Sequence, residues 1–173
     1  MESLVGEPVD WKAVVRGARI VLGERSKDLL AASYVCLGLL HEEGFQGLAA
    51  GLACLHEMSS RYWDGLYPDA KRLQKRIDVL IWLCEKLEAA VGGQSPLPHD
   101  QEALQACEEL ARTLDAVLTE KLAGKSPGMS GLRAILQQQT EKLIQTATKS
   151  EGKGQELKSG EAQARTAVPG TIA

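Results

Sequence analysis

The fold of this protein is decided by residues 29–40, which read LLAASYVCLGLL. The stretch carries no charge, and a His-Glu-Glu run at residues 41–43 closes it. Its clearest stripe recurs at three- and four-residue spacing through Leu29, Ala32, Cys36 and Leu40, as in a helix. Because its apolar face is broad, we expect this helix at the centre of the molecule. The stretch is about half as long as the roughly 20 residues that a membrane span requires, so no membrane insertion is expected.

Apolar residues at the same spacing predict further helices on both sides of this stretch. The expected segments are 10–23, 26–43, 45–63, 69–91, 100–123 and 130–147. Hydrophobic residues make up 44% of the chain and aromatic residues only 4%, and Leu and Ala dominate over strand-favouring residues. The sequence therefore predicts an all-α protein: a compact bundle of about six helices with a disordered C-terminal tail.

Helix ends are marked by capping residues and glycines. Asp10 is expected to cap the first helix and Ser26 the second, where Ser26→Ala would cost about 1 kcal/mol. Gly44 is suited to end the second helix in a left-handed conformation. Gly47 and Gly51 lie inside the third helix, where each costs about 1 kcal/mol relative to Ala. We therefore expect a neighbouring helix to approach these two glycines closely.

The same patterns divide the chain into three parts. A flexible N-terminus is expected over residues 1–9, a helical domain over 10–148, and a disordered tail or interdomain linker over 149–173. The last part is polar and Gly-rich, so little in it offsets the entropy lost on ordering. The first eight residues are acidic and lack the basic and apolar regions of a signal peptide. We therefore expect the protein to be cytoplasmic.

Residues that usually carry chemistry are scattered along the chain. The cysteines are Cys36, Cys54, Cys84 and Cys107, and the histidines are His41, His56 and His99. The cysteines form no C-x-x-C pair and lie among apolar residues, which predicts reduced core thiols. No histidine has the spacing of a zinc or general-base site. We expect no enzyme activity, catalytic residue, metal or cofactor, and a net charge of −3 argues against nucleic acid as a partner.

The candidate binding site is the aromatic corner at residues 63–69, which reads WDGLYPD. Pro68 disfavours helix at the residue before it, and Gly65 permits a turn. The only concentrated basic patch of the chain follows. The candidate protein-binding residues are Trp63, Tyr67, Lys71, Arg72, Lys75 and Arg76. Arg76 precedes the inward-facing Ile77, so its planar fork can reach a buried or loop acceptor.

Structural interpretations of these residues stay open beside the functional one. Trp63 and Tyr67 can be interface anchors, yet Trp11, Trp63 and Trp82 are also expected to fill a common core. The basic residues can meet an acidic protein surface, or they can form a solvated helix face.

Five short fragments follow one another in a recognisable order. They are Asp10-Trp11, Arg25-Ser26-Lys27-Asp28-Leu29, Gly44-Phe45-Gln46-Gly47-Leu48 with Gly51-Leu52, Tyr62-Trp63-Asp64-Gly65-Leu66-Tyr67-Pro68, and Arg76 with Trp82-Leu83. Over residues 10–87 this order resembles the N-terminal, ImpA-related domain of TssA proteins of bacterial type VI secretion systems.

The resemblance implies a cytoplasmic, non-enzymatic assembly component. Such a component contacts baseplate, membrane-complex and tail proteins and helps to build the tail tube and sheath. It also implies a homo-oligomeric full-length protein, whereas a monomer or weak dimer is expected for this chain, which lacks the ring-forming C-terminal region. A generic helical adaptor is the first alternative. A small hydrolase or ligand-binding domain with a pocket at Trp63, Tyr67 and Arg76 is the second.

Overall fold

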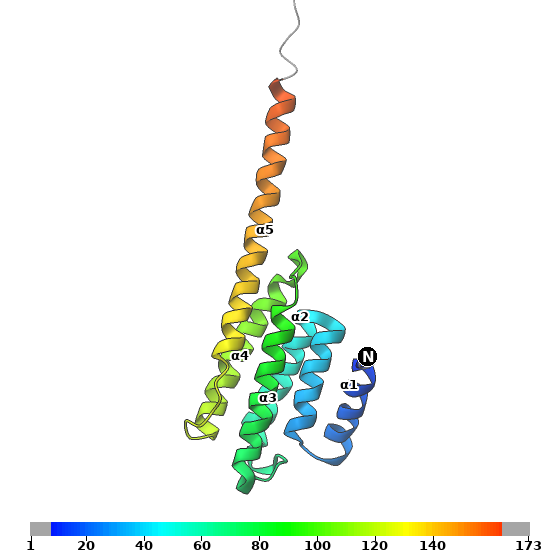
Figure 1. The fold of residues 1–173 in the computed structure, drawn as a ribbon, viewed down its shortest axis with the longest axis vertical. Helices are drawn as coiled ribbons and strands as arrows, with labels where there is room; N and C mark the ends of the chain where they lie inside the picture. Colours follow the sequence, from blue (N-terminus) through cyan, green and yellow to red (C-terminus); the bar gives the residue numbers. More distant parts are fainter. Residues whose placement is uncertain (1–7, 164–173) are drawn as a thin grey trace, which may run out of the picture.

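The computed structural model describes residues 8–163, with only the backbone given for residue 147 and residues 149–163. This described part forms five α-helices: α1 (Trp11–Ile20), α2 (Leu29–Arg61), α3 (Leu73–Gly92), α4 (Gln101–Lys121) and α5 (Ser130–Gln163). A π-helical turn, Val21–Arg25, follows α1, and 3-10 turns lie at Trp63–Gly65, Ala70–Arg72 and Pro98–Asp100. Within residues 8–163 there is no strand, so the all-α prediction is confirmed (Figure 1).

Helix α2 is bent back on itself at Gly44. This residue has φ 62° and ψ −141°, a backbone conformation that essentially only glycine adopts. The bend separates a first arm, residues 29–43, from a second arm, residues 45–61. With the two arms counted separately, residues 8–163 contain the six helical segments that the sequence predicts.

Two glycines of the second arm allow the arms to pack against each other. A Cβ atom on Gly51 would lie 2.5 Å from Cα of Cys36, and one on Gly47 would collide with the carbonyl oxygen of Leu39. Both neighbours belong to the first arm, and their order along it shows that the arms run antiparallel. The predicted close approach at Gly47 and Gly51 is confirmed.

The other helices surround the two arms of α2. Helix α1 lies along the first arm, where Val15 fills the space that a Cβ on Gly38 would need. Helix α4 packs on α2, and the Cys107 thiol donates to the carbonyl of Phe45 at 3.3 Å. Fully buried leucines make up much of the main core: Leu29, Leu40, Leu48, Leu52, Leu80, Leu83, Leu87 and Leu104.

The last helix is longer than the sequence predicts. Helix α5 continues to Gln163, so the expected end of the sixth helical segment at residue 147 is wrong, whereas a disordered tail or linker over residues 149–173 stays a prediction. Figure 1 shows that its final turns extend beyond the other helices. No proline interrupts residues 149–163, and adding residues to a helix that already exists avoids the cost of nucleation. Residues 1–7 and 164–173, where the rest of the flexible termini was expected, lie outside the described residues.

Helix α2 is capped by Asp28, and the prediction of Ser26 as its cap is wrong. The Asp28 carboxylate accepts from the backbone N–H of Leu30 at 2.8 Å and of Ala31 at 3.1 Å. Ser26 lies two residues earlier in extended backbone, with φ −158° and ψ 156°. Asp10 caps α1 as predicted, since its carboxylate accepts the N–H of a first-turn residue at 3.0 Å.

We expect Asp28→Ala to lower the free energy of unfolding by about 1 kcal/mol, because two N–H groups of the first turn lose their acceptor. Ser26→Ala is the matched control and is expected to change that free energy by less than about 0.5 kcal/mol. Urea denaturation of both variants measures the difference. Equal losses would mean that Ser26 also contributes to the cap.

All four cysteines are free; Cys36, Cys84 and Cys107 are buried, whereas Cys54 is half-buried. Burial raises the pKa of the Cys84 thiol to about 11 and that of Cys107 to about 12. It raises the pKa of Cys36 as well. The predicted core thiols are confirmed at these three positions, and Cys54 lies at the edge of the core.

At about pH 8, iodoacetamide is expected to modify Cys54 of the folded protein well before the other three cysteines. The thiolate is the reacting form, and the three buried thiols are both shielded and held in the protonated form. Mass spectrometry of timed samples follows each site, with guanidinium-unfolded protein as the control in which all four react. Earlier modification of Cys36 than of Cys54 would contradict the burial pattern.

The three tryptophans belong to one hydrophobic core, as predicted, but only Trp63 lies inside it, whereas Trp11 and Trp82 pack against it as partly buried side chains. Trp63 is buried. Trp11 is half-buried and stacks on His41, with ring centres 4.4 Å apart. Trp82 is also half-buried and packs against Tyr34, with ring centres 5.0 Å apart. Helical spacing gives the inward side of a helix, but it does not distinguish the centre of the bundle from its edge.

Candidate protein-interaction site

The corner between α2 and α3 is organised by Arg76 of α3. Its Nε donates to the carbonyl of Pro68 at 2.6 Å, Nη1 to that of Trp63 at 2.9 Å, and Nη2 to that of Leu66 at 2.6 Å. The Arg76 side chain is fully buried. One guanidinium therefore fastens three carbonyls of the corner to helix α3, which confirms the predicted reach of the Arg76 fork to a loop acceptor.

The buried charge of Arg76 is balanced by dipoles rather than by a salt bridge. Among the described side chains, no carboxylate lies within 4.0 Å of its guanidinium. The Trp63 ring centre is 4.6 Å from the guanidinium carbon, an arrangement in which a cation is attracted by the ring face. Burial lowers the pKa of Arg76, an effect that the charges of Asp69 and Asp64 oppose. The Arg76 guanidinium nevertheless stays protonated, because arginine does not lose its proton in proteins.

Two backbone hydrogen bonds tie the same corner to the start of α2. Leu29 N–H donates to the carbonyl of Tyr67 at 2.8 Å, and Tyr67 N–H donates to the carbonyl of Lys27 at 2.9 Å. The backbone of Tyr67 is thus held in place while its side chain stays 55% exposed. An aromatic side chain on a fixed backbone loses little conformational entropy on binding, which suits an interface anchor.

The six candidate residues fall into two groups in the structure. The buried group consists of Trp63 and Arg76, and the exposed group consists of Tyr67, Lys71, Arg72 and Lys75. The buried group builds the corner, so its members are not free to contact a partner. The exposed group lies on the corner, on the 3-10 turn after it and on the first turn of α3, which places one aromatic ring and three cations on neighbouring segments.

Tyr62 is a further exposed aromatic residue at this corner that the sequence analysis did not single out. Its side chain is 48% exposed, and the Lys27 ammonium lies 5.8 Å from its ring centre. Lys27 also donates to the carbonyl of Leu22 at 3.0 Å. The only sign in the sequence that Tyr62 belongs to the corner is its position directly before Trp63. Its contact with Lys27 joins residues far apart in sequence, so local patterns could not reveal it.

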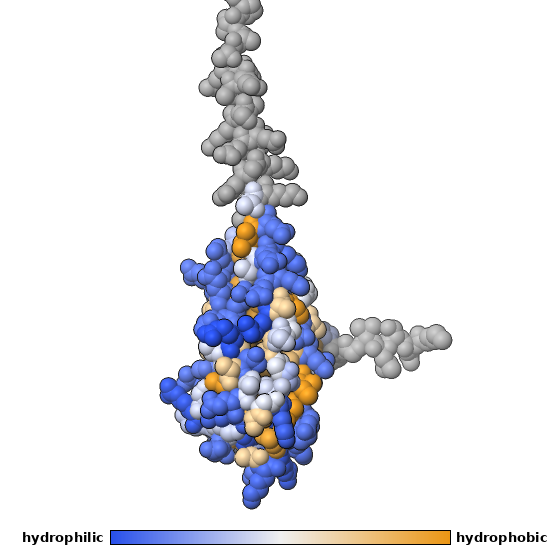
Figure 2. Space-filling view, turned by 90° about the vertical axis from the view of Figure 1, so that its left-hand side faces the viewer, coloured by the Kyte–Doolittle hydropathy of each residue, from blue (hydrophilic) through white to orange (hydrophobic). Residues whose placement is uncertain are grey.

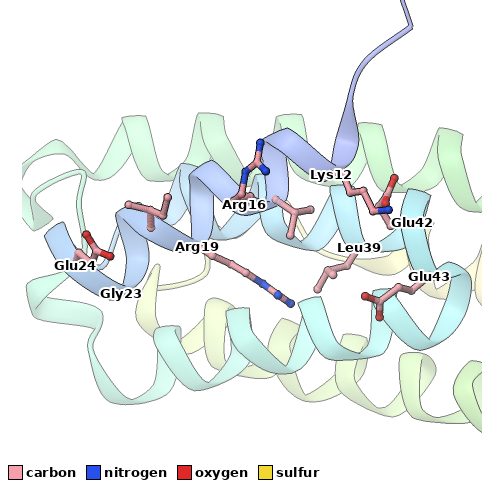
Figure 3. Close-up of a pocket in the computed structure, with 10 residues that line it drawn as sticks. Lys12, Arg16, Arg19, Gly23, Glu24, Leu39, Glu42 and Glu43 are labelled. Atoms are coloured by element: carbon pink, nitrogen blue, oxygen red, sulfur yellow. The ribbon is translucent and has the colours of Figure 1, made fainter.

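The packing of Arg76 on Trp63 fills the space in which the small-ligand alternative would place a pocket. The structure instead has a groove of about 470 Å³ between α1 and the first arm of α2. Basic residues of α1 and acidic residues of the first arm line it: Lys12, Arg16, Arg19, Glu42 and Glu43. In Figure 3, Arg19 extends from α1 toward Leu39 of the first arm.

Within the described part of the chain, no group of three or more His, Cys, Asp or Glu is placed to hold a metal ion. No helix of that part is both long enough and apolar enough to cross a membrane. The face in Figure 2 is mostly hydrophilic and carries only small apolar patches, so an extended apolar interface is not visible there.

The family model, the relative and the solved structure that resemble this chain are all described as parts of type VI secretion systems. Residues 2–85 match the family model described as ImpA, N-terminal, type VI secretion system. The type VI secretion system component TssA1 of Pseudomonas aeruginosa is 40% identical over 65 residues, which is 38% of this chain and 19% of that protein. This chain therefore aligns with about a fifth of the length of that relative.

A solved structure has the same fold. It is the N-terminal domain, including the conserved ImpA_N region, of the TssA component of the type VI secretion system from Burkholderia cenocepacia. The TM-score is 0.73 over 83% of this chain and 80% of the other, with 17% sequence identity. At that identity the likeness concerns the fold, whereas the corner residues have to be judged by their own geometry.

Proposed function

Because this chain carries an ImpA-related N-terminal domain of the TssA type, we propose that it is a non-enzymatic assembly module of a type VI secretion system. In this role it contacts other proteins of the system, among baseplate, membrane-complex and tail components, and helps the baseplate, tail tube and sheath to assemble in the cytoplasm. The full-length protein acts as a homo-oligomer, and the chain described here is a monomer or weak dimer.

The observation that carries this proposal is the exposed Tyr67 on an immobilised corner. Burying a charged arginine is costly, and here the cost is compensated by three carbonyls and one ring that fix the loop. The result is a rigid backbone that holds an amphipathic ring in solvent. Tyrosine is among the residues that most often carry binding energy at protein interfaces.

The cations beside Tyr67 indicate the chemistry of the partner surface. Lys71, Arg72 and Lys75 are exposed, and none of them is within ion-pairing distance of a described carboxylate. Their charges are therefore available to attract an acidic protein surface and to accelerate encounter. We infer a partner that offers a recess for the Tyr67 ring within an acidic rim.

We expect Tyr67→Ala to weaken binding to a purified subunit of the same secretion system at least tenfold, about 1.4 kcal/mol. The loss should appear as faster dissociation. The contacts of an anchoring ring form only after the two proteins have met, so removing the ring affects how long the complex lasts more than how fast it forms. The subunit is first chosen by pull-down with the folded chain, and surface plasmon resonance then measures both rate constants. The fold should tolerate the substitution because the side chain is exposed.

The contribution of the cations is tested by a double charge reversal, Lys71→Glu with Lys75→Glu. The control is the charge reversal Lys142→Glu at another exposed position, on α5. The double variant should slow association at low salt, and the effect should fade as salt rises. Lys142→Glu should leave both rates unchanged. Unaltered binding by both Tyr67→Ala and the double variant would move the interface away from the corner, and retention of no subunit would contradict the assembly role.

A further inference from the structure

Two exposed tyrosines stand at the ends of the short turn that Arg76 fastens to α3. Tyr62 directly follows α2 and is 48% exposed, and Tyr67 lies beyond the 3-10 turn and is 55% exposed. The turn is also closed from within, because the N–H of Gly65 donates to the carbonyl of Tyr62 at 2.9 Å. The backbones of the two tyrosines are therefore fixed relative to each other, while both side chains reach solvent.

Lys27 is a common neighbour of the two tyrosines. Its ammonium lies 5.8 Å from the ring centre of Tyr62, within the range of a cation–π contact. Its carbonyl accepts the N–H of Tyr67 at 2.9 Å, and its ammonium donates to the carbonyl of Leu22 at 3.0 Å. Figure 1 shows the connection from α1 to α2, which contains Lys27, at the same end of the bundle as the corner. One residue thus joins both tyrosines to the segment before α2.

Two groups of exposed cations accompany the tyrosines. Arg25 and Lys27 lie before α2, where they line a hollow of about 240 Å³ together with Glu24. The second group follows the corner and consists of Lys71, Arg72 and Lys75. Among the side chains that the structure describes, none of these five cations lies within 4.0 Å of a carboxylate. Their charges are therefore available to a ligand.

Most carboxylates of this surface already have partners. Asp28 and Asp69 accept backbone N–H groups at the starts of α2 and of the second 3-10 turn. Glu57 forms an ion pair at 2.7 Å with the arginine one turn later. Glu24 and Asp64 are exposed and have no such partner among the described residues. Five cations thus face two carboxylates, which leaves positive charge in excess around the tyrosines.

We propose that Tyr62 and Tyr67 bind the partner together, as an aromatic pair, and that the partner contributes one short segment in which apolar residues lie between acidic residues. The apolar side chains cover the two rings, and the carboxylates face the two groups of cations. The inference rests on the proposed function, because it concerns the same surface and specifies the chemistry of its partner.

The arrangement favours a protein segment over a lipid surface. Anionic headgroups would also be attracted to the five cations. A flat layer of like charges would however meet Glu24 and Asp64 as well, and Asp64 lies between the two tyrosines in the chain. A peptide can instead place apolar side chains on the rings and carboxylates only where the cations are.

Three fluorescein-labelled peptides of about nine residues test the chemistry, since about 3.3 Å per residue lets such a peptide span the corner. The first has Leu and Phe between two runs of Asp, the second has Lys in place of Asp, and the third has Gly in place of Leu and Phe. Fluorescence anisotropy at low salt measures binding to the folded chain. The first peptide is expected to bind at least tenfold more tightly than either of the others. Equal binding of the first two, or of the first and third, would overturn the proposal.

Tyr62→Ala is expected to weaken binding of the first peptide at least fivefold, as is Tyr67→Ala. Tyr34→Ala is the matched control: Tyr34 is a 37% exposed tyrosine that packs against Trp82 instead of lying at the corner, so its loss should not change binding. Circular dichroism checks the fold, and Tyr62→Gln serves if Tyr62→Ala does not fold. A loss with Tyr67→Ala but none with the Tyr62 variant would overturn the aromatic pair.

The role of Lys27 is tested by Lys27→Met, which should weaken the first peptide, whereas Lys27→Arg should retain most of the affinity because it keeps a cation near the ring. Lys142→Met, at an exposed position on α5, is the control and should have no effect. Because Lys27 holds the ring of Tyr62, Tyr62→Ala should cost less affinity in the Lys27→Met background than in the unmodified chain. Strictly additive losses would overturn the positioning role of Lys27.

The same variants separate this inference from the proposed function. Binding of a retained secretion subunit that depends on Tyr67 but not on Tyr62 would overturn the aromatic pair and leave the assembly role intact. Selective binding of the first peptide through both rings, without retention of any subunit, would support the pair and contradict the assembly role. Flotation with phosphatidylglycerol vesicles tests the lipid surface, and vesicle binding that Tyr62→Ala abolishes would overturn the acidic segment as the occupant.

Discussion

Arg76→Met is expected to lower the free energy of unfolding by about 3–5 kcal/mol. The substitution leaves the carbonyls of Pro68, Trp63 and Leu66 without their donor, and each buried acceptor left unpaired costs about 1–3 kcal/mol. Part of this loss is offset because the charge of Arg76 no longer has to be buried. Urea denaturation measures the change.

Lys75→Met is the matched control for Arg76→Met. It removes one cation from the adjacent position of the same helix, but Lys75 is exposed, so a change within about 0.5 kcal/mol is expected. Arg76→Lys should remain strongly destabilised, because one ammonium cannot reproduce a planar fork that reaches three acceptors. Similar stabilities of Arg76→Met and Lys75→Met would contradict the role assigned to the buried guanidinium.

The start of α2 shows where sequence reasoning reaches its limit. Ser26 and Asp28 are both favourable cap residues, and they lie only two positions apart. The structure selects Asp28 because Lys27 and Leu29 exchange backbone hydrogen bonds with Tyr67, which holds the chain extended until Leu29. That pairing joins segments far apart in sequence, so local propensity could not reveal it.

The bundle itself was predictable because glycine and apolar spacing are local signals. Gly44 marked the bend of α2, and the cost of Gly47 and Gly51 inside a helix required a close neighbour. The end of α5 at Gln163 was not predicted because the sequence has no local signal for it. A polar, Gly-rich segment without proline is compatible with both a tail and a helix that continues.

The candidate site was predictable only in part. The fork of Arg76 was expected to reach loop acceptors, and it does. Trp63 and Tyr67 looked alike as corner aromatics, yet one is buried under the guanidinium and the other is 55% exposed. That difference depends on which ring faces α3. The groove of about 470 Å³ results from the packing of α1 on α2, and no single segment contains all of its lining residues.

Gly51→Ala is expected to lower the free energy of unfolding by about 2–3 kcal/mol, although alanine is the better helix former by about 1 kcal/mol. The new Cβ would lie 2.5 Å from Cα, 2.8 Å from Sγ and 2.9 Å from Cβ of Cys36. Because one of these atoms belongs to the backbone, a side-chain rotation cannot relieve the contact, and the two arms of α2 must separate. Overpacking of this kind usually costs about 1–3 kcal/mol and occasionally more.

The control for this prediction is Gly17→Ala in α1, since a Cβ at Gly17 would meet nothing within 4 Å. There the helix propensity acts alone, and the free energy of unfolding should rise by up to about 1 kcal/mol. The same chemical change is therefore expected to have opposite signs at two helical positions of one protein. Thermal and urea denaturation of both variants measure the signs. Stabilisation by Gly51→Ala would show that the arms can separate at little cost. The close packing of Gly51 on Cys36 would then not explain the glycine at this position.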